Sequence, residues 1–143
     1  MKRIVLILAI GMVAVGVLKL RLVPQQQPSQ SVAPVAVVAE NLDTPWAMVF
    51  LPDGGMLVTE RPGRVRLINK DGILAPNPGA TIVSVKEIGE GGLLGLALHP
   101  QFAANPFAYL YYTYKGIENK TFNRVVRMTY TGGKLADEQV IVD

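Results

Sequence analysis

Short apolar runs separated by turn residues make up the chain from Val35 onward. Trp46–Leu51 is apolar on both faces, whereas Arg64–Asn69 partly alternates charged and apolar residues. Turn sequences such as Asp53-Gly54-Gly55 separate the runs, and no useful length of chain has the period of an amphipathic helix. This pattern predicts an all-β protein. The expected strands are Val35–Ala39, Trp46–Leu51, Met56–Thr59, Arg64–Asn69, Thr81–Lys86, Leu93–Leu98, Tyr109–Tyr114 and Arg124–Tyr130, with one more beginning at Val140–Val142.

An internal repeat relates two of these strands. Trp46–Pro52 aligns with Leu94–Pro100 at an offset of 48 residues, and each copy continues into a second strand and then a strand with basic residues. Repeats of about 40–50 residues with four strands each are typical of β-propeller blades. The innermost strand of a blade is covered on both faces, which fits the continuous apolarity. Residues 35–143 therefore predict about two blades of a β-propeller.

Two blades are fewer than the four to eight of a closed propeller. They would leave an open inner surface and two unpaired blade faces, an apolar exposure that stable monomers rarely tolerate. We therefore expect a fragment, a truncated product or one piece of a larger protein. A relic that does not fold independently is the remaining alternative.

The N-terminus has the pattern of an export signal. Lys2-Arg3 precedes fifteen uncharged residues, Ile4–Leu18, and a second basic pair follows at Lys19 and Arg21. Fifteen helical residues reach only about 22 Å, short of a bilayer core, but continuation to Val23 would allow a span. We therefore expect a signal peptide or signal anchor over residues 1–23, with the uncleaved anchor favoured and residues 4–23 in the inner membrane. The Pro- and Gln-rich residues 24–34 predict a linker, and residues 35–143 a partial propeller domain that is periplasmic or otherwise extracytoplasmic.

Charge and composition exclude several classes of function. The net charge of +3 comes from the leader, because the remaining residues hold ten bases against eleven acids. That balance removes the electrostatic argument for a nucleic-acid surface. The chain contains no cysteine, so disulfides, thiolate metal sites and a cysteine nucleophile are excluded.

Three blocks of sequence resemble the glucose/sorbosone dehydrogenase family. They are Pro45–Gly54 with Leu57–Arg64, then Gly89–Phe102, and finally Tyr109–Tyr114 with Asn123–Arg127. The resemblance implies a six-bladed propeller that binds pyrroloquinoline quinone (PQQ) and calcium on its top face. It also implies oxidation of a sugar at its anomeric carbon: a histidine takes the hydroxyl proton, hydride passes to the quinone, and cationic side chains hold the quinone carboxylates.

Glu90 is the one candidate cofactor-binding residue. The family commonly has a glutamine at this position, facing the quinone, and an amide can donate a hydrogen bond to a quinone oxygen. A carboxylate cannot do so unless it is protonated, and it adds charge beside an anionic cofactor. A solvated loop glutamate is the alternative interpretation.

The single histidine, His99, is interpreted as a turn or core residue rather than a catalytic base. The strand Leu93–Leu98 separates it from Glu90 by about 17 Å, which places the two residues near opposite faces of the propeller. The family's histidine lies in a later segment. We therefore predict no catalytic residue and no metal ligand in this chain.

Three other features are interpreted as structural. Thr59-Glu60-Arg61 predicts a structural ion pair, and Trp46 predicts a core residue. Strand tyrosines are ordinarily packing residues, although stacking on a carbohydrate is the alternative; here they are Tyr109, Tyr111, Tyr112 and Tyr114.

The sequence leaves two functions open. The first is the N-terminal part of a PQQ-dependent sugar dehydrogenase that lacks the catalytic base and most cofactor ligands. The second is a non-catalytic, membrane-tethered propeller used as a binding or scaffold module, because propellers carry many functions.

Overall fold

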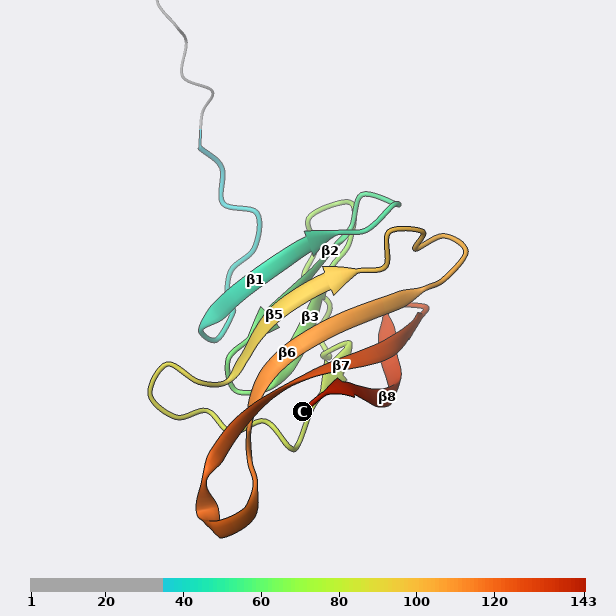
Figure 1. The fold of residues 1–143 in the computed structure, drawn as a ribbon. Helices are drawn as coiled ribbons and strands as arrows, with labels where there is room; N and C mark the ends of the chain where they lie inside the picture. Colours follow the sequence, from blue (N-terminus) through green and yellow to red (C-terminus); the bar gives the residue numbers. More distant parts are fainter. Residues whose placement is uncertain (1–34) are drawn as a thin grey trace, which may run out of the picture. The chain divides into compact units, whose positions relative to one another are not determined.

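The structure, a computed structural model, describes residues 35–143, and the expected leader and linker lie outside them. These residues form strands and one short 3₁₀ turn, Ile117–Asn119 (Figure 1). Among them there is no helix of the length and apolarity needed to cross a membrane. The strands are β1 (Pro45–Phe50), β2 (Met56–Glu60), β3 (Arg64–Ile68), β4 (Ala80–Thr81), β5 (Leu93–Leu98), β6 (Phe107–Lys115), β7 (Thr121–Thr131) and β8 (Lys134–Val142).

The strands form two four-stranded antiparallel sheets in which sequence neighbours are also spatial neighbours. The first sheet has the order β1-β2-β3-β4, and the second has the order β5-β6-β7-β8. The edge strands β1 and β5 lie beside one another without being hydrogen-bonded into one sheet (Figure 1). The prediction of an all-β protein is therefore confirmed, with each repeat forming its own sheet.

The register of the two sheets supports the repeat found in the sequence. Met48 pairs with Val58 in the first sheet, and Leu96 pairs with Leu110 in the second. Both edge strands also carry an irregularity at their start, between Pro45 and Met48 and between Leu93 and Gly95. Strands β1 and β5 thus begin their sheets in the same way, 48 residues apart.

The hydrophobic core lies between the facing surfaces of the two sheets. Leu57 and Val65 of the first sheet and Leu110 and Val126 of the second are fully buried. Burial of branched apolar side chains contributes about 1.5–3 kcal/mol each, so this interface stabilises the pair of sheets. A hydrogen bond from the Thr59 hydroxyl to the carbonyl of Leu94 (3.0 Å) joins the sheets across it.

The remaining face of the first sheet is only partly covered. Trp46, Met48 and Phe50 are 50%, 58% and 65% exposed, so β1 has the open apolar face that was expected of two blades without the rest of a ring. Trp46 was expected in the core. It is half exposed because β1 is an edge strand, and the Arg61 guanidinium, 5.8 Å from the ring centroid, covers the indole only in part.

Two strand predictions are wrong. Val35–Ala39 forms no strand, because no described strand pairs with it to satisfy its backbone groups. The predicted strand Thr81–Lys86 is reduced to β4, after which the chain turns at Ile82, whose carbonyl accepts a hydrogen bond from the amide of Val85 (3.2 Å).

The last strand was predicted to begin at Val140–Val142. It instead starts at Lys134 and completes the second sheet as β8. The tight turn responsible is Gly132-Gly133, where both residues have positive φ angles and Thr131 pairs with Lys134 across the turn.

Candidate functional site

The loop before β5 carries Glu90 and borders a hollow of about 330 Å³. We call it the Glu90 hollow. Strands β5, β6 and β7 contribute the rest of its lining. The residues that line it are Ile88, Glu90, Gly91, Leu94, Tyr111, Thr113, Thr121 and Asn123.

Glycines let this loop pack tightly against its neighbours. Gly92 has a φ of +149°, and a Cβ there would stand 2.6 Å from the carbonyl oxygen of Arg61. A Cβ at Gly91 would stand 2.8 Å from the hydroxyl of Thr113. Gly89 also has a positive φ, +53°, but has open space around it. Gly91 and Gly92 therefore permit close backbone approach, and Glu90 is exposed at the edge of the hollow.

Hydrogen bonds join strand β6 to the loop and to strand β7 beside the hollow. The Thr113 hydroxyl donates to Oδ1 of Asn123 at 2.7 Å, and the Thr113 amide donates to the carbonyl of Gly92 at 2.9 Å. The hollow thus combines one carboxylate with hydroxyl and amide groups. Of the described residues that line it, none is a lysine or arginine.

The side chain of Arg61 is hydrogen-bonded to the loop that carries Glu90. Its Nη2 donates to the carbonyls of Gly89 and Gly91, the second at 3.2 Å, so one guanidinium nitrogen is bonded on both sides of Glu90. The same guanidinium lies 5.8 Å from the ring centroid of Trp46. This cluster was not predicted, because the contacts join residues 28 and 30 positions apart along the chain.

His99 lies at the other end of β5 from Glu90, as predicted. Its Nδ1 accepts a hydrogen bond from the Gln101 amide (3.0 Å), and its ring packs near Phe107 and Tyr109 at centroid distances of 6.1 and 6.5 Å. This is the environment of a turn residue packed on strand aromatics.

The Glu60 carboxylate forms ion pairs, but not with the neighbour in sequence that was expected. It is completely buried and contacts Arg64 Nε at 2.6 Å and Arg66 Nη1 at 3.2 Å, while Arg61 points to the Gly89–Gly91 loop. Successive residues of a strand point to opposite faces, so Glu60 pairs across the strands rather than with Arg61.

The strand tyrosines have different environments. Tyr112 is fully buried, and its hydroxyl donates to Glu138 at 2.6 Å and shares a hydrogen bond with Ser84 at 3.0 Å. Burial raises the pKa of the Tyr112 hydroxyl, and the neighbouring Glu138 adds to the effect. Tyr111 is 39% exposed and faces the Glu90 hollow.

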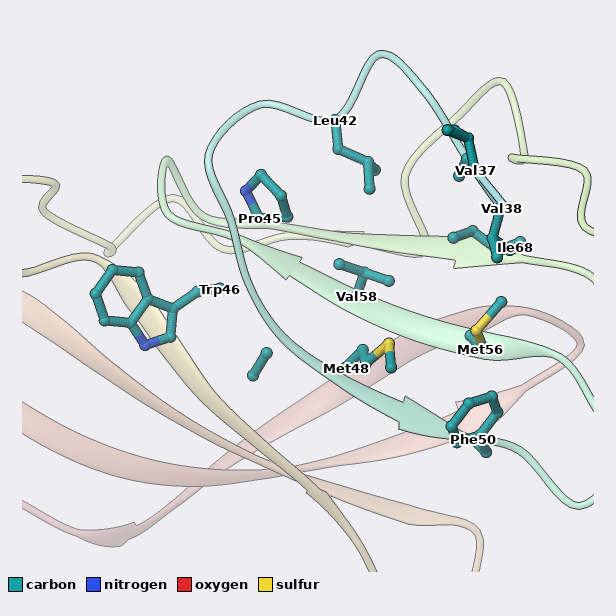
Figure 2. A pocket seen from close by; sticks show the side chains of 12 residues that line it. Val37, Val38, Leu42, Pro45, Trp46, Met48, Phe50, Met56, Val58 and Ile68 are labelled. Carbon is teal, nitrogen blue, oxygen red and sulfur yellow. The ribbon is translucent and has the colours of Figure 1, made fainter. Parts of the chain in front are cut away.

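A larger hollow of about 540 Å³ lies over the open face of the first sheet (Figure 2). Val37, Val38 and Leu42, from the segment before β1, face Val58 and Ile68 across it. The residues that line it are apolar, so it offers no group for acid–base or redox chemistry. Within residues 35–143 there is also no cluster of three His, Cys, Asp or Glu residues able to hold a metal ion.

The fold consists of two adjacent four-stranded antiparallel sheets with equivalent edge strands, and a glycine-rich loop precedes the second sheet. This arrangement is that of neighbouring blades in a β-propeller protein. The family model of glucose/sorbosone dehydrogenases matches residues 42–143, so the chain belongs to the glucose/sorbosone dehydrogenase family.

Individual relatives agree with this assignment. The chain is 41% identical over 88 residues to aldose sugar dehydrogenase YliI of Escherichia coli, covering 60% of this chain and 23% of that protein. It is 33% identical over 112 residues to quinoprotein glucose dehydrogenase B of Acinetobacter calcoaceticus, covering 71% of this chain and 22% of the relative. The PQQ-bound structure of aldose sugar dehydrogenase from Streptomyces coelicolor matches with a TM-score of 0.66 and 31% identity, covering 76% of this chain and 32% of that one.

The chain therefore spans less than a third of the length of the curated relatives it matches. The family match over residues 42–143 covers both sheets and the loops between them.

Proposed function

We propose that this chain is the N-terminal portion of a PQQ-dependent sugar dehydrogenase that oxidises an aldose at its anomeric carbon. It supplies about two blades of a six-bladed propeller over residues 35–143, together with the Glu90 edge of the cofactor pocket. The observation that carries the proposal is the position of Glu90 on a glycine loop that opens onto a polar hollow at the start of the edge strand β5.

The residues of the Glu90 hollow fit PQQ only in part. The hydroxyls of Thr121 and Tyr111 are able to donate hydrogen bonds to quinone oxygens, as is the amide of Asn123, whereas the Thr113 hydroxyl already donates to Asn123 Oδ1. No lysine or arginine lines the described hollow to neutralise the cofactor's carboxylates, and the Glu90 carboxylate repels them. Among the described residues, the hollow therefore supplies hydrogen-bond donors for the quinone but no cationic partner for its carboxylates. When bound, the quinone would accept the hydride from the sugar.

The catalytic base also lies outside this chain in the proposed arrangement. His99 is bonded to Gln101 and packed on β6 at the end of β5 remote from the Glu90 hollow. A general base must reach the proton that it removes, within about 3 Å or through one water. His99 does not meet that requirement for a sugar in the Glu90 hollow.

The sequence supports export of the protein. The basic and apolar pattern of residues 1–23 is that of a signal peptide or anchor, followed by a linker over residues 24–34. We place the propeller domain outside the cytoplasm on that pattern.

A chimera tests the proposal. Residues 42–143 replace the matching segment of the Streptomyces coelicolor aldose sugar dehydrogenase, and PQQ binding is followed by quinone absorbance alongside aldose-dependent reduction of a dye. The expected result is binding with sugar oxidation. A chimera that folds but binds no PQQ would contradict the proposal.

The non-catalytic binding module remains the second candidate because Glu90 replaces the family's usual amide. The variant Glu90→Gln of the same chimera separates the two functions. If the Glu90→Gln chimera binds PQQ and the unsubstituted chimera does not, a domain that has lost its cofactor is favoured. If both chimeras bind PQQ, the dehydrogenase is favoured.

A further inference from the structure

The side chain of Arg61 joins three parts of the molecule that are distant in sequence. It leaves the end of β2, donates to both carbonyls that flank Glu90, and lies against the indole of Trp46 at the start of β1. Its side chain is only 16% exposed. A guanidinium has a rigid fork of donors, so it fixes the groups that it bonds more firmly than a lysine does.

The backbone around Arg61 is fixed as well. Its carbonyl accepts a hydrogen bond from the amide of Leu93 (2.9 Å), and Gly92 approaches that carbonyl too closely for any side chain. The start of β5 is therefore anchored to the main chain of Arg61, and the loop before it to the side chain. Glu90 lies between those two anchoring points.

One nitrogen of the guanidinium has no ideal partner. Arg61 Nε is buried without a hydrogen bond, and the nearest carboxylate oxygen, Glu87 Oε1, is 3.7 Å away. A buried donor without a hydrogen bond costs free energy. The side chain keeps this position nevertheless, because Nη2 gains two carbonyl acceptors and the charged group packs on Trp46.

We propose that Arg61 is a positioning residue that holds the Gly89–Gly92 loop, and with it the Glu90 carboxylate, at the edge of the cofactor pocket. The role in a pocket rests on the proposed function. The positioning of the loop and of Trp46 is a property of this chain and is tested without PQQ.

Hydrogen exchange on the full chain measures the loop directly. The Gly91 amide donates to the carbonyl of Ile88 (2.7 Å) and reports the order of the loop, whereas the Leu93 amide bonds the main chain of Arg61 and serves as an internal reference. In Arg61→Lys we expect Gly91 to exchange faster by about tenfold, the effect of losing a hydrogen bond to a charged group. The exchange of Leu93 and of the core residue Val126 should be unchanged.

A matched control separates the loop from general stability. Arg127 also lies over an aromatic ring, Phe107, at 4.4 Å and bonds a neighbouring side chain, Gln139, but it does not contact the loop. Arg127→Lys should leave the exchange of Gly91 at its original rate.

Fluorescence quenching measures the second contact. Trp46 is the single tryptophan of the chain and is half exposed, so iodide and caesium reach it from solvent. The nearby guanidinium attracts iodide and repels caesium, and Arg61→Gln should abolish the resulting excess of iodide quenching. Arg61→Lys retains a positive charge and should preserve part of that excess.

Two results would overturn the proposal. One is unchanged exchange at Gly91 in Arg61→Lys, which would show that the guanidinium does not hold the loop. The other is equal acceleration at Gly91, Leu93 and Val126, which would show that Arg61 acts on global stability alone. If both measurements succeed and the chimera still binds no PQQ, the proposed function fails while the positioning role stands.

Discussion

The carboxylate of Glu60 is completely buried and lies 2.6 Å from Nε of Arg64, its partner across the β2–β3 pair. The other carboxylate oxygen accepts from Arg66 and from the backbone amide of Asp43, at 3.2 and 2.8 Å. This network links the chain before β1 to the open face of the first sheet. Such an arrangement stabilises the fold only while all its members are present, because an unpaired buried charge is costly.

Removal of the Glu60 carboxylate should therefore destabilise the protein strongly. We expect Glu60→Ala to lower the free energy of unfolding by about 3–5 kcal/mol, because it leaves the mostly buried Arg66 without a carboxylate and removes one of the two carboxylate partners of Arg64. Urea denaturation of the full chain measures the change. Glu118→Ala is the matched control: its ion pair with Lys120, at 2.8 Å, is exposed, and its loss should cost no more than about 1 kcal/mol. Equal effects would contradict a special role for the buried network.

Acid should weaken the contact between Asp43 and Arg64. The hydrogen bond from Arg64, followed by that from the Thr44 hydroxyl, lowers the pKa of Asp43 below its ordinary value. A carboxyl with a lowered folded-state pKa stabilises the fold above its unfolded pKa, near about 4, and loses that effect as pH falls through the folded value. Asp43→Asn should therefore be less stable than the wild type at pH 7 and equally stable near pH 2. A difference of the same size at both pH values would contradict the assignment, and Asp71→Asn, which alters the exposed pair with Lys70, is the control.

The buried hydroxyl of Tyr112 should contribute to stability through its charged acceptor. Tyr112→Phe removes the hydrogen bonds to Glu138 and Ser84, and we expect a loss of about 1.5–3 kcal/mol in the free energy of unfolding. Tyr111→Phe is the control, since that ring is partly exposed, and should change stability little.

Alkaline unfolding checks the same residue independently. Because the folded-state pKa of Tyr112 is raised, the neutral phenol stabilises the fold below its ordinary pKa, and this contribution disappears as pH rises through the raised value. The stability advantage of the wild type over Tyr112→Phe should shrink above about pH 10. An advantage that grows in that range would show that the phenolate, and not the phenol, is favoured.

Gly92 should tolerate substitution much less than Gly89. Both have positive φ angles, but only at Gly92 would an added Cβ meet another atom, the carbonyl oxygen of Arg61, at 2.6 Å. Gly89→Ala should cost about 1–2 kcal/mol for its left-handed backbone. Gly92→Ala adds overpacking of a further 1–3 kcal/mol, roughly, and should also speed the exchange of Gly91. Thermal unfolding of the two variants measures the difference, and equal midpoints would contradict the close approach.

The apolar runs predicted most of the strands because each has a hydrogen-bonding neighbour. Leu93–Leu98 was predicted with both ends correct, and the offset of 48 residues marks the first strand of each sheet. Val35–Ala39 has an equally apolar sequence but no partner among the described strands, and pairing cannot be found from composition. The signal for the β7–β8 turn lies in the Gly132-Gly133 pair and not in the apolar runs, so the start of β8 was missed.

The candidate site was predictable only in part. The resemblance pointed to Glu90, and strand length separated it from His99. The contacts of Arg61 with Gly89 and Gly91, and the pairing of Glu60 with Arg64, depend on which strands lie side by side. The exposure of Trp46 likewise depends on what covers an edge strand, which local sequence does not contain.

The affinity of the chimera for PQQ, compared between Glu90→Ala and His99→Ala, is the decisive measurement for the proposed cofactor pocket. Glu90 lines the hollow at the start of β5, and His99 lies at its other end against Phe107 and Tyr109. We expect Glu90→Ala to lower the dissociation constant for PQQ, because it removes a carboxylate that repels the anionic cofactor, and His99→Ala to leave both that constant and the rate of sugar oxidation unchanged. Loss of sugar oxidation in His99→Ala with the fold intact, together with no effect of Glu90→Ala on PQQ binding, would show that the pocket has been placed at the wrong end of β5.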